Sequence, residues 1–127
     1  MKEVMAIIRM NMVNPTKTAL AGAGFPAFSC RKCLGRGKKS VDMAVVQSLL
    51  ETGETPMNPV GEHLTESHRL IAKRLFTIMV DDGQVGEVVR IIIETNQTGN
   101  PGDGKIFILP IMEAYTVRTG ESTKDAY

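Results

Sequence analysis

The stretch that decides the fold is residues 81–111, with the sequence DDGQVGEVVRIIIETNQTGNPGDGKIFILPI. Its first half predicts a helix, because Asp81 or Asp82 can cap the start and apolar residues then recur along one helical face. The apolar residues of that face are Val85, Val88, Val89, Ile92 and Ile93. A glycine-rich loop follows, and the apolar run that begins at Lys105 predicts a strand. The order is therefore helix, glycine loop, strand.

The glycine loop matches only part of the frame of a phosphate-binding P-loop. Gly99, Gly104 and Lys105 have the required spacing, but Ile106 stands where a P-loop has the Ser or Thr that holds Mg²⁺. A P-loop also follows a strand and opens a helix, which is the reverse of the order here. Gly102 and Gly104 still let the backbone approach an anion, and Lys105 supplies a positive charge. A plain helix-to-strand turn is the alternative that these residues leave open.

The N-terminal part of the chain predicts a strand and a short helix. Residues 4–10, VMAIIRM, form a compact apolar run typical of a buried strand. Asn14 can then cap a helix with Pro15 in its first turn, and Gly22 or Gly24 can end it.

Two further strands are predicted on either side of a long loop. Residues 25–37, FPAFSCRKCLGRG, indicate a strand that ends at Gly35 and Gly37. Residues 70–80 fit a helical spacing, but their β-branched and aromatic end, LFTIMV, favours a strand that ends at Val80. Residues 40–65 are rich in Gly, Pro and acidic residues and indicate a long exposed loop, which in a compact domain usually has a function.

The order β-α-β, loop, β-α-β predicts one domain over residues 1–127, a ferredoxin-like α+β sandwich with both helices on one face of the sheet. Its long regulatory loop is expected at about 37–70 and a C-terminal tail at 112–127. The strands are apolar almost throughout, so the second face must also be covered. Because no residues remain to cover it, we expect another subunit there, in a homo-oligomer.

The composition excludes several classes of function. The net charge is +1, from 15 basic and 14 acidic residues, so no overall field attracts nucleic acid or an anionic membrane. No apolar run approaches the roughly 20 residues that cross a bilayer, and the first residues lack the pattern of a signal peptide. These patterns predict a cytoplasmic protein without membrane insertion.

Two smaller motifs carry less specific signals. The turn GRGKK, residues 35–39, could hold an anion or be a solvated basic turn. Cys30 and Cys33 have CxxC spacing, which suits a redox pair or half a zinc site. In a strand this odd spacing places them on opposite faces, so we expect no metal site. No catalytic constellation stands out, and binding is expected rather than catalysis.

Residues 98–111, TGNPGDGKIFILPI, closely resemble the C-terminal signature of the PII nitrogen-regulatory proteins. The stretch from MKEVMAIIRMN through ALAGAGF, residues 1–25, and RTGE, residues 118–121, are similar to the same family. The resemblance covers nearly the whole chain. Residues 40–70 align poorly and are longer than the usual T-loop of the family.

The resemblance implies a ferredoxin-like trimer that binds ATP or ADP in clefts between subunits and senses 2-oxoglutarate near the base of the T-loop. It implies two effector residues, Lys39 and Lys73. The nucleotide-binding residues that it implies are Ser29, Gly35, Gly37, Lys38, Gly102, Asp103, Gly104, Lys105 and Arg118.

The chain departs from the typical family pattern at several positions. Lys39 stands where typical members have the Gln that helps to hold Mg²⁺ and 2-oxoglutarate, and a cation there would repel Mg²⁺. Thr116 replaces a second C-terminal Arg. Residues 40–70 contain no Tyr that could be uridylylated. These departures most resemble the nif-linked PII proteins of archaea and some anaerobic bacteria, which inhibit nitrogenase together with a paralogous partner until 2-oxoglutarate and ATP relieve the inhibition.

Three functions follow as hypotheses. The first is a non-catalytic regulator, a homotrimer or a hetero-assembly with a paralogue, whose loop at 37–70 docks on dinitrogenase under the control of nucleotide and 2-oxoglutarate. The second is a PII regulator of an ammonium transporter or of glutamine synthetase. The third is an NTP-hydrolysing enzyme, in which turnover would depend on Lys105.

Overall fold

The computed structural model describes residues 1–37 and 70–127. The chain divides into two units, Met1–Cys33 together with Ala72–Tyr127, and Leu34–Ile71. The fold described below is that of the first unit. The expected regulatory loop, with Lys38 and Lys39, lies outside the described residues apart from its two ends, and the single-domain boundary at 1–127 stays a prediction.

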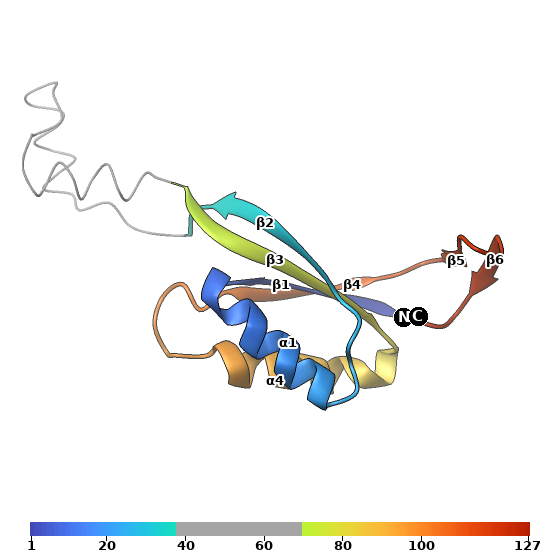
Figure 1. Cartoon of the computed structure of the whole chain (residues 1–127), viewed down its shortest axis with the longest axis horizontal. Helices are drawn as coiled ribbons and strands as arrows, with labels where there is room; N and C mark the ends of the chain where they lie inside the picture. Colours follow the sequence, from blue (N-terminus) through green and yellow to red (C-terminus); the bar gives the residue numbers. More distant parts are fainter. Residues whose placement is uncertain (38–69) are drawn as a thin grey trace, which may run out of the picture. The chain divides into compact units, whose positions relative to one another are not determined.

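A four-stranded sheet forms the centre of the fold, with strand order β2-β3-β1-β4 (Figure 1). The strand β1 is central and pairs antiparallel with both β3 and β4, so that Val4 lies opposite Ile78 on one side and Ile108 on the other. The strands are β1 (Lys2–Ile8), β2 (Ser29–Gly35), β3 (Ile71–Val80) and β4 (Lys105–Pro110).

The buried side chains of the sheet alternate with a period of two. On β1 they are Val4, Ala6 and Ile8, and on β3 they are Phe76, Ile78 and Val80. This alternation is that of a half-buried strand, so the strand predicted to end at Val80 is confirmed and the helical spacing of residues 70–80 has no structural counterpart. Phe28 stacks on Phe76 with ring centroids 4.6 Å apart and extends the core toward β2.

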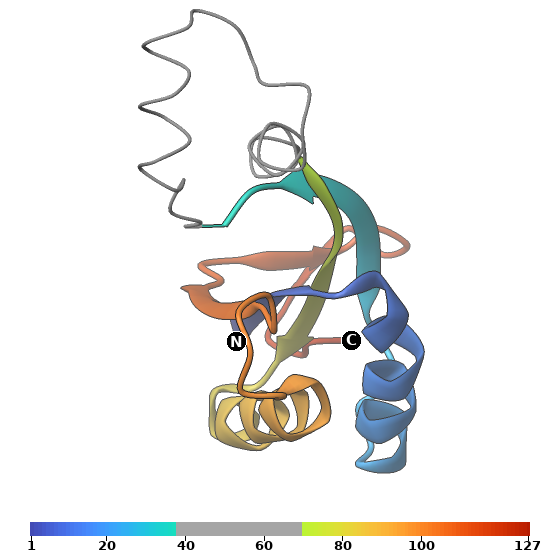
Figure 2. The same cartoon turned by 90° about the vertical axis from the view of Figure 1, so that its left-hand side faces the viewer.

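The two helices α1 (Val13–Gly22) and α4 (Val85–Asn96) lie on the same side of the sheet (Figure 2). A short 3-10 turn, Asp82–Gln84, leads into α4, and Asp81 and Gln84 form the capping box there, as the sequence predicts for Asp81. The predicted cap at Asn14 is wrong, because α1 begins at Val13 directly after another 3-10 turn, Met10–Met12, and its start has no side-chain cap.

The buried face of α4 differs from the predicted face in one apolar residue and includes one polar residue. Val88 and Ile92 are buried, but Ile91 takes the place expected for Ile93, which is 44% exposed. The reason is that α4 packs on α1 as well as on the sheet. Asn96, also buried, donates from Nδ2 to Oγ1 of Thr16 on α1 at 2.9 Å, so the contact between the helices rotates the buried face.

Two βαβ halves with both helices on one sheet face define a ferredoxin-like α+β sandwich, which confirms the predicted fold class. The C-terminal tail adds a hairpin that its sequence did not indicate, β5 (Ala114–Thr116) with β6 (Glu121–Thr123). Strands of three residues are too short to show a period. The hairpin turn closes through the Gly120 N–H, which donates to the Thr116 carbonyl at 2.7 Å.

The sheet face away from the helices carries many apolar side chains and is only partly buried. Met5, Ile7, Leu75 and Met79 are half-buried there, and Phe107 is 41% exposed. In the described part of the chain both α-helices lie on the other face. The expectation that another subunit covers this face stays a prediction. Among the described residues, no helix is long and apolar enough to span a membrane.

Candidate functional site: the glycine-rich loop

The glycine-rich loop, residues 97–104, connects the end of α4 to the start of β4. Its backbone enters the left-handed region at Gly99, Gly102 and Gly104, where φ is 83°, 97° and 118°. Glycine adopts such angles without the steric penalty of a side chain. The sequence therefore supplies glycine at the positions where this loop turns.

Gly104 meets a second constraint besides its φ angle. A Cβ atom at this position would lie 2.0 Å from the carbonyl oxygen of Ile7, which is closer than any real contact of that kind. At Gly102 a Cβ would lie 3.3 Å from Nη2 of Arg9 and 3.7 Å from Nζ of Lys73. The loop therefore rests directly on the backbone of β1 and beside two cations.

The carboxylate of Asp103 organises the loop from within. Its Oδ2 accepts hydrogen bonds from the backbone N–H groups of Thr98 at 2.7 Å and Gly99 at 2.9 Å. Its Oδ1 accepts from the hydroxyl of Thr98 and, at 2.7 Å, from Nη1 of Arg9. These bonds tie the two ends of the loop together.

The same contacts stabilise the charged form of Asp103. The Thr98 hydroxyl first, then the Thr98 backbone N–H and the Arg9 guanidinium, hold the pKa of the Asp103 carboxyl far below its usual range. Asp103 is therefore ionised at neutral pH, and its oxygens are already engaged inside the loop.

Two cations hold consecutive carbonyl groups of the loop. Nη2 of Arg9 donates to the Pro101 carbonyl at 3.2 Å, and Nζ of Lys73 donates to the Gly102 carbonyl at 2.7 Å. Lys73 is on β3, and Arg9 follows β1 directly. Sequence reasoning missed Arg9. The available signal was a charge inside the apolar run VMAIIRM, since a charged side chain at the end of a buried strand needs a partner.

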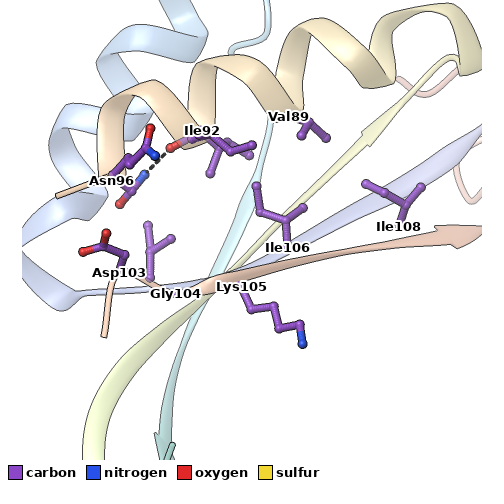
Figure 3. Close-up of a pocket in the computed structure, with 11 residues that line it drawn as sticks. Val89, Ile92, Asn96, Asp103, Gly104, Lys105, Ile106 and Ile108 are labelled. Carbon is purple, nitrogen blue, oxygen red and sulfur yellow. Dashed lines mark hydrogen bonds between the residues drawn. The ribbon is translucent and has the colours of Figure 1, made fainter. Parts of the chain in front are cut away.

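The structure brings together five of the residues implied by the resemblance, namely Lys73, Gly102, Asp103, Gly104 and Lys105. Lys105 points away from α4 and from the apolar side chains that lie between α4 and β4 (Figure 3). Its Nζ lies 5.7 Å from the centroid of the Phe107 ring, on the sheet face without helices. The cationic side of the loop is therefore the side away from the helices.

Two of the remaining implied residues, Ser29 and Arg118, do not join this cluster. Ser29 begins β2, the edge strand on the opposite side of the sheet from β4. Arg118 lies exposed in the turn between β5 and β6. Gly35 and Gly37 belong to the second unit, and Lys38 and Lys39 lie outside the described residues.

A pocket of about 400 Å³ opens between α4 and β4, on the other side of the loop. Isoleucine and valine dominate its walls, which suits a phosphate group poorly. Sequence reasoning did not indicate this pocket. Its lining residues, most of which Figure 3 labels, are Ile8, Val89, Ile92, Ile93, Asn96, Gln97, Asp103, Gly104, Lys105, Ile106 and Ile108.

Fold and loop together define a class of protein, a ferredoxin-like module with a glycine-rich, cation-flanked loop between its second helix and last strand. Comparison with known proteins gives the family. The family described as nitrogen regulatory protein P-II matches residues 1–121. The chain therefore belongs to the P-II family of nitrogen regulatory proteins, and the resemblance seen in residues 98–111 is confirmed.

Relatives and a solved structure support this assignment over nearly the full chain. The Nitrogen fixation nifHD region GlnB-like protein 2 of Methanothermococcus thermolithotrophicus is 44% identical, over 96% of this chain and 94% of the relative. Its namesake from Methanobacterium ivanovii is 40% identical, over 99% and 98%. The crystal structure of Arabidopsis thaliana PII bound to citrate superposes with a TM-score of 0.68 at 27% identity, covering 97% of this chain and 85% of that one.

These findings settle the coarse function. Proteins of the P-II family are regulatory signalling proteins, and the relatives named for the nifHD region confirm the predicted likeness to nitrogen-fixation-linked members. The citrate in the Arabidopsis protein is a small acidic molecule bound by a member of the family.

Proposed function

We propose that this protein binds ATP or ADP through residues 98–105, senses 2-oxoglutarate beside the same loop, and controls a target protein through residues 37–70. The observation that carries the proposal is the loop itself. Left-handed glycines let its backbone approach a ligand, Arg9 offsets the charge of Asp103, and the cations Arg9, Lys73 and Lys105 lie beside the loop.

The nucleotide phosphates are proposed to lie on Gly102, Asp103, Gly104 and Lys105. The proposal adds Ser29, Gly35, Gly37, Lys38 and Arg118 from elsewhere in the chain. Ser29 lies on the opposite edge strand from β4, so one copy does not bring it to its own loop. A neighbouring copy can do so, which supports a nucleotide cleft between subunits and a homotrimer.

The effector is proposed to bind Lys73 and Lys39. Lys73 donates to a neutral acceptor, the Gly102 carbonyl, and a carboxylate of 2-oxoglutarate is a stronger acceptor for its ammonium group. The described residues contain no cluster of three His, Cys, Asp or Glu side chains that could hold a metal. We propose that Mg²⁺, where used, is carried mainly by the nucleotide phosphates, because a cation at Lys39 would repel it.

The proposed target is dinitrogenase. The relatives named for the nifHD region support it, and Methanothermococcus thermolithotrophicus has both a protein 1 and a protein 2 similar to this chain. That pair supports a hetero-assembly with a paralogue as the alternative to the homotrimer. The proposed role is regulatory and non-catalytic, in the cytoplasm.

Calorimetry tests the ligand proposal directly. ATP and ADP are titrated with and without 2-oxoglutarate and with and without Mg²⁺. We expect binding of both nucleotides, and a loss of about tenfold or more in affinity for Lys105→Ala, since hydrogen bonds to charged groups contribute about 1.5–3 kcal/mol. Lys17→Ala, an exposed lysine on α1, is the matched control. Absence of nucleotide binding under every condition would refute the site.

A second experiment tests the target. The protein is immobilised and offered dinitrogenase, an ammonium transporter and glutamine synthetase. Capture of dinitrogenase that 2-oxoglutarate with ATP releases supports the proposal, whereas capture of either other target favours the alternative regulator. Phosphate release measured in parallel tests the hydrolase alternative, which predicts turnover that falls in Lys105→Ala while nucleotide binding largely persists.

A further inference from the structure

We propose that Arg9 is a positioning residue for the nucleotide loop: it fixes the loop's shape from the central strand and offsets the charge of Asp103, so that an anion can approach the backbone. Nothing in the family comparison assigns this role to Arg9. The ligand-binding half of the proposal rests on the proposed function, whereas the shape-fixing half does not.

The guanidinium of Arg9 reaches two different parts of the loop at once. Nη1 pairs with Asp103 Oδ1 at 2.7 Å and Nη2 donates to the Pro101 carbonyl at 3.2 Å. The planar fork of arginine suits such a double contact, and the single ammonium of lysine does not. Only 29% of the Arg9 side chain and 23% of the Asp103 side chain are exposed, so solvent screens the pair incompletely.

The support for Arg9 comes from an inner strand of the sheet. Arg9 follows β1, which is hydrogen-bonded on both sides, to β3 and to β4. The loop, by contrast, is held mainly by its own short-range bonds to Asp103. Arg9 therefore anchors the loop to the centre of the sheet, at Pro101 and Asp103, which lie 92 and 94 residues further along the chain.

The carbonyl contacts decide which way the loop's N–H groups point. In a trans peptide the C=O and the next N–H point in opposite directions, and the described chain has no cis peptides. Arg9 holds the Pro101 carbonyl and Lys73 holds the Gly102 carbonyl, so the N–H groups of Gly102 and Asp103 point away from these cations. Outward N–H groups at successive residues form an anion-binding concavity.

Asp103 is the obstacle to an anion in this loop, and Arg9 is its counter-charge. An uncompensated carboxylate would repel a phosphate group placed on its own backbone N–H. The oxygens of Asp103 instead face Arg9, Thr98 and Gly99, inside the loop. With the charges of Arg9 and Asp103 cancelled, Lys73 and Lys105 give the loop a net positive charge.

Hydrogen exchange measured by NMR tests the shape-fixing role without any ligand. In Arg9→Gln we expect the amides of Thr98 and Gly99 to exchange at least about tenfold faster, because their acceptor Asp103 is no longer held. The amides of Val4 and Ile78 in the core report that the variant is folded and should not change. Arg90→Gln is the matched control, since Arg90 also pairs with a carboxylate, Glu94 at 3.0 Å, on the exposed side of α4. Unchanged exchange at Thr98 and Gly99 would overturn the proposal.

ADP titration tests the electrostatic role. Arg9→Gln should weaken ADP binding about tenfold or more, and adding Asp103→Asn to it should restore part of the affinity, because the uncompensated charge is then removed. A purely structural Arg9 predicts that the double variant binds no better than Arg9→Gln. Affinity equal to wild type in Arg9→Gln would also refute the role. If the wild type itself binds no ADP while the exchange result holds, the proposed function fails and the shape-fixing role of Arg9 stands.

Discussion

The glycines of the loop differ in how much space a side chain would have, and the sequence does not distinguish them. Gly99 has a positive φ and open space around the position of a Cβ, whereas Gly104 has both a positive φ and the Ile7 carbonyl oxygen 2.0 Å from that position. A substitution at Gly99 therefore strains only the local backbone, and one at Gly104 must also displace β1 or the loop. Spacing in the sequence placed both in the frame of a P-loop and could not rank them.

This difference predicts the outcome of two alanine substitutions. Gly99→Ala should lower the free energy of unfolding by about 1–2 kcal/mol, the usual cost of a left-handed non-glycine residue. Gly104→Ala should cost more than the roughly 1–3 kcal/mol of backbone strain alone, because the clash adds to it. Urea unfolding of both variants measures the difference. Equal losses would show that the loop moves freely away from Ile7.

The depressed pKa of Asp103 predicts an acid-stable loop. Because the pKa is lower in the folded state than its unfolded value of about 3.9, the stabilisation is fully present above that value and is lost as the pH falls through the lower folded pKa. Asp103→Asn should therefore be less stable than wild type at pH 7, and the difference should shrink only below about pH 4.

Urea unfolding at pH 7, 5 and 3 measures that difference, with Asp125→Asn in the exposed C-terminal tail as control. A direct NMR titration of the Asp103 carboxyl carbon gives an independent reading, and a midpoint at or above about 3.9 would contradict the interpretation of its contacts.

The predicted strands and helix caps are confirmed where the local sequence pattern agrees with the burial of the residues. The strand over residues 71–80 and the cap at Asp81 follow from β-branched residues and from side-chain chemistry close in the chain. The cap at Asn14 failed because a 3-10 turn starts the helical segment earlier, and the buried face of α4 shifted because α1 packs against it. The first failure comes from the turn that directly precedes the helix, and the second from a neighbour that a local pattern does not contain.

The polar contact between the helices provides a test at this scale. Thr16 Oγ1 accepts from Asn96 Nδ2 and donates to the Met12 carbonyl at 2.7 Å, and both side chains are buried. Thr16→Val should lower the free energy of unfolding by about 1–3 kcal/mol, since it leaves buried polar groups without a partner. Thr18→Val, at an exposed position of the same helix, should change it by less than about 0.5 kcal/mol. Thermal unfolding compares the two, and similar losses would contradict a specific role for the buried bond.

For the whole molecule, two features lead us to expect an oligomer: the sheet face without helices is uncovered in the described part of the chain, and the implied site residues lie at opposite edges of the sheet. Copies of the chain that pack through this face would cover it and would bring the site residues of one copy to the loop of another. Light scattering should then give a mass about three times the 13.9 kDa of one chain.

A charge on that sheet face should break the assembly. Met5 lies at the middle of β1, between Thr77 on β3 and Phe107 on β4. Met5→Glu buries an unpaired charge in the proposed interface and should shift the mass toward the monomer. Ala21→Glu, on the exposed side of α1, is the control and should leave the mass unchanged. A Met5→Glu variant with the wild-type mass would place the interface elsewhere.

The sequence by itself determined the order of the four sheet strands and the two helices, the glycine loop between the second helix and the last strand of the sheet, and the family to which the chain belongs. These features are local, since they depend on periodicity, turn residues and a motif of consecutive positions. Only the tertiary structure decided which residues act on the loop. Arg9 reaches Asp103 across 94 positions and Lys73 reaches Gly102 across 29. The physical reason is that strand pairing and register place β1 between β3 and β4, and no short-range pattern in the chain specifies that arrangement.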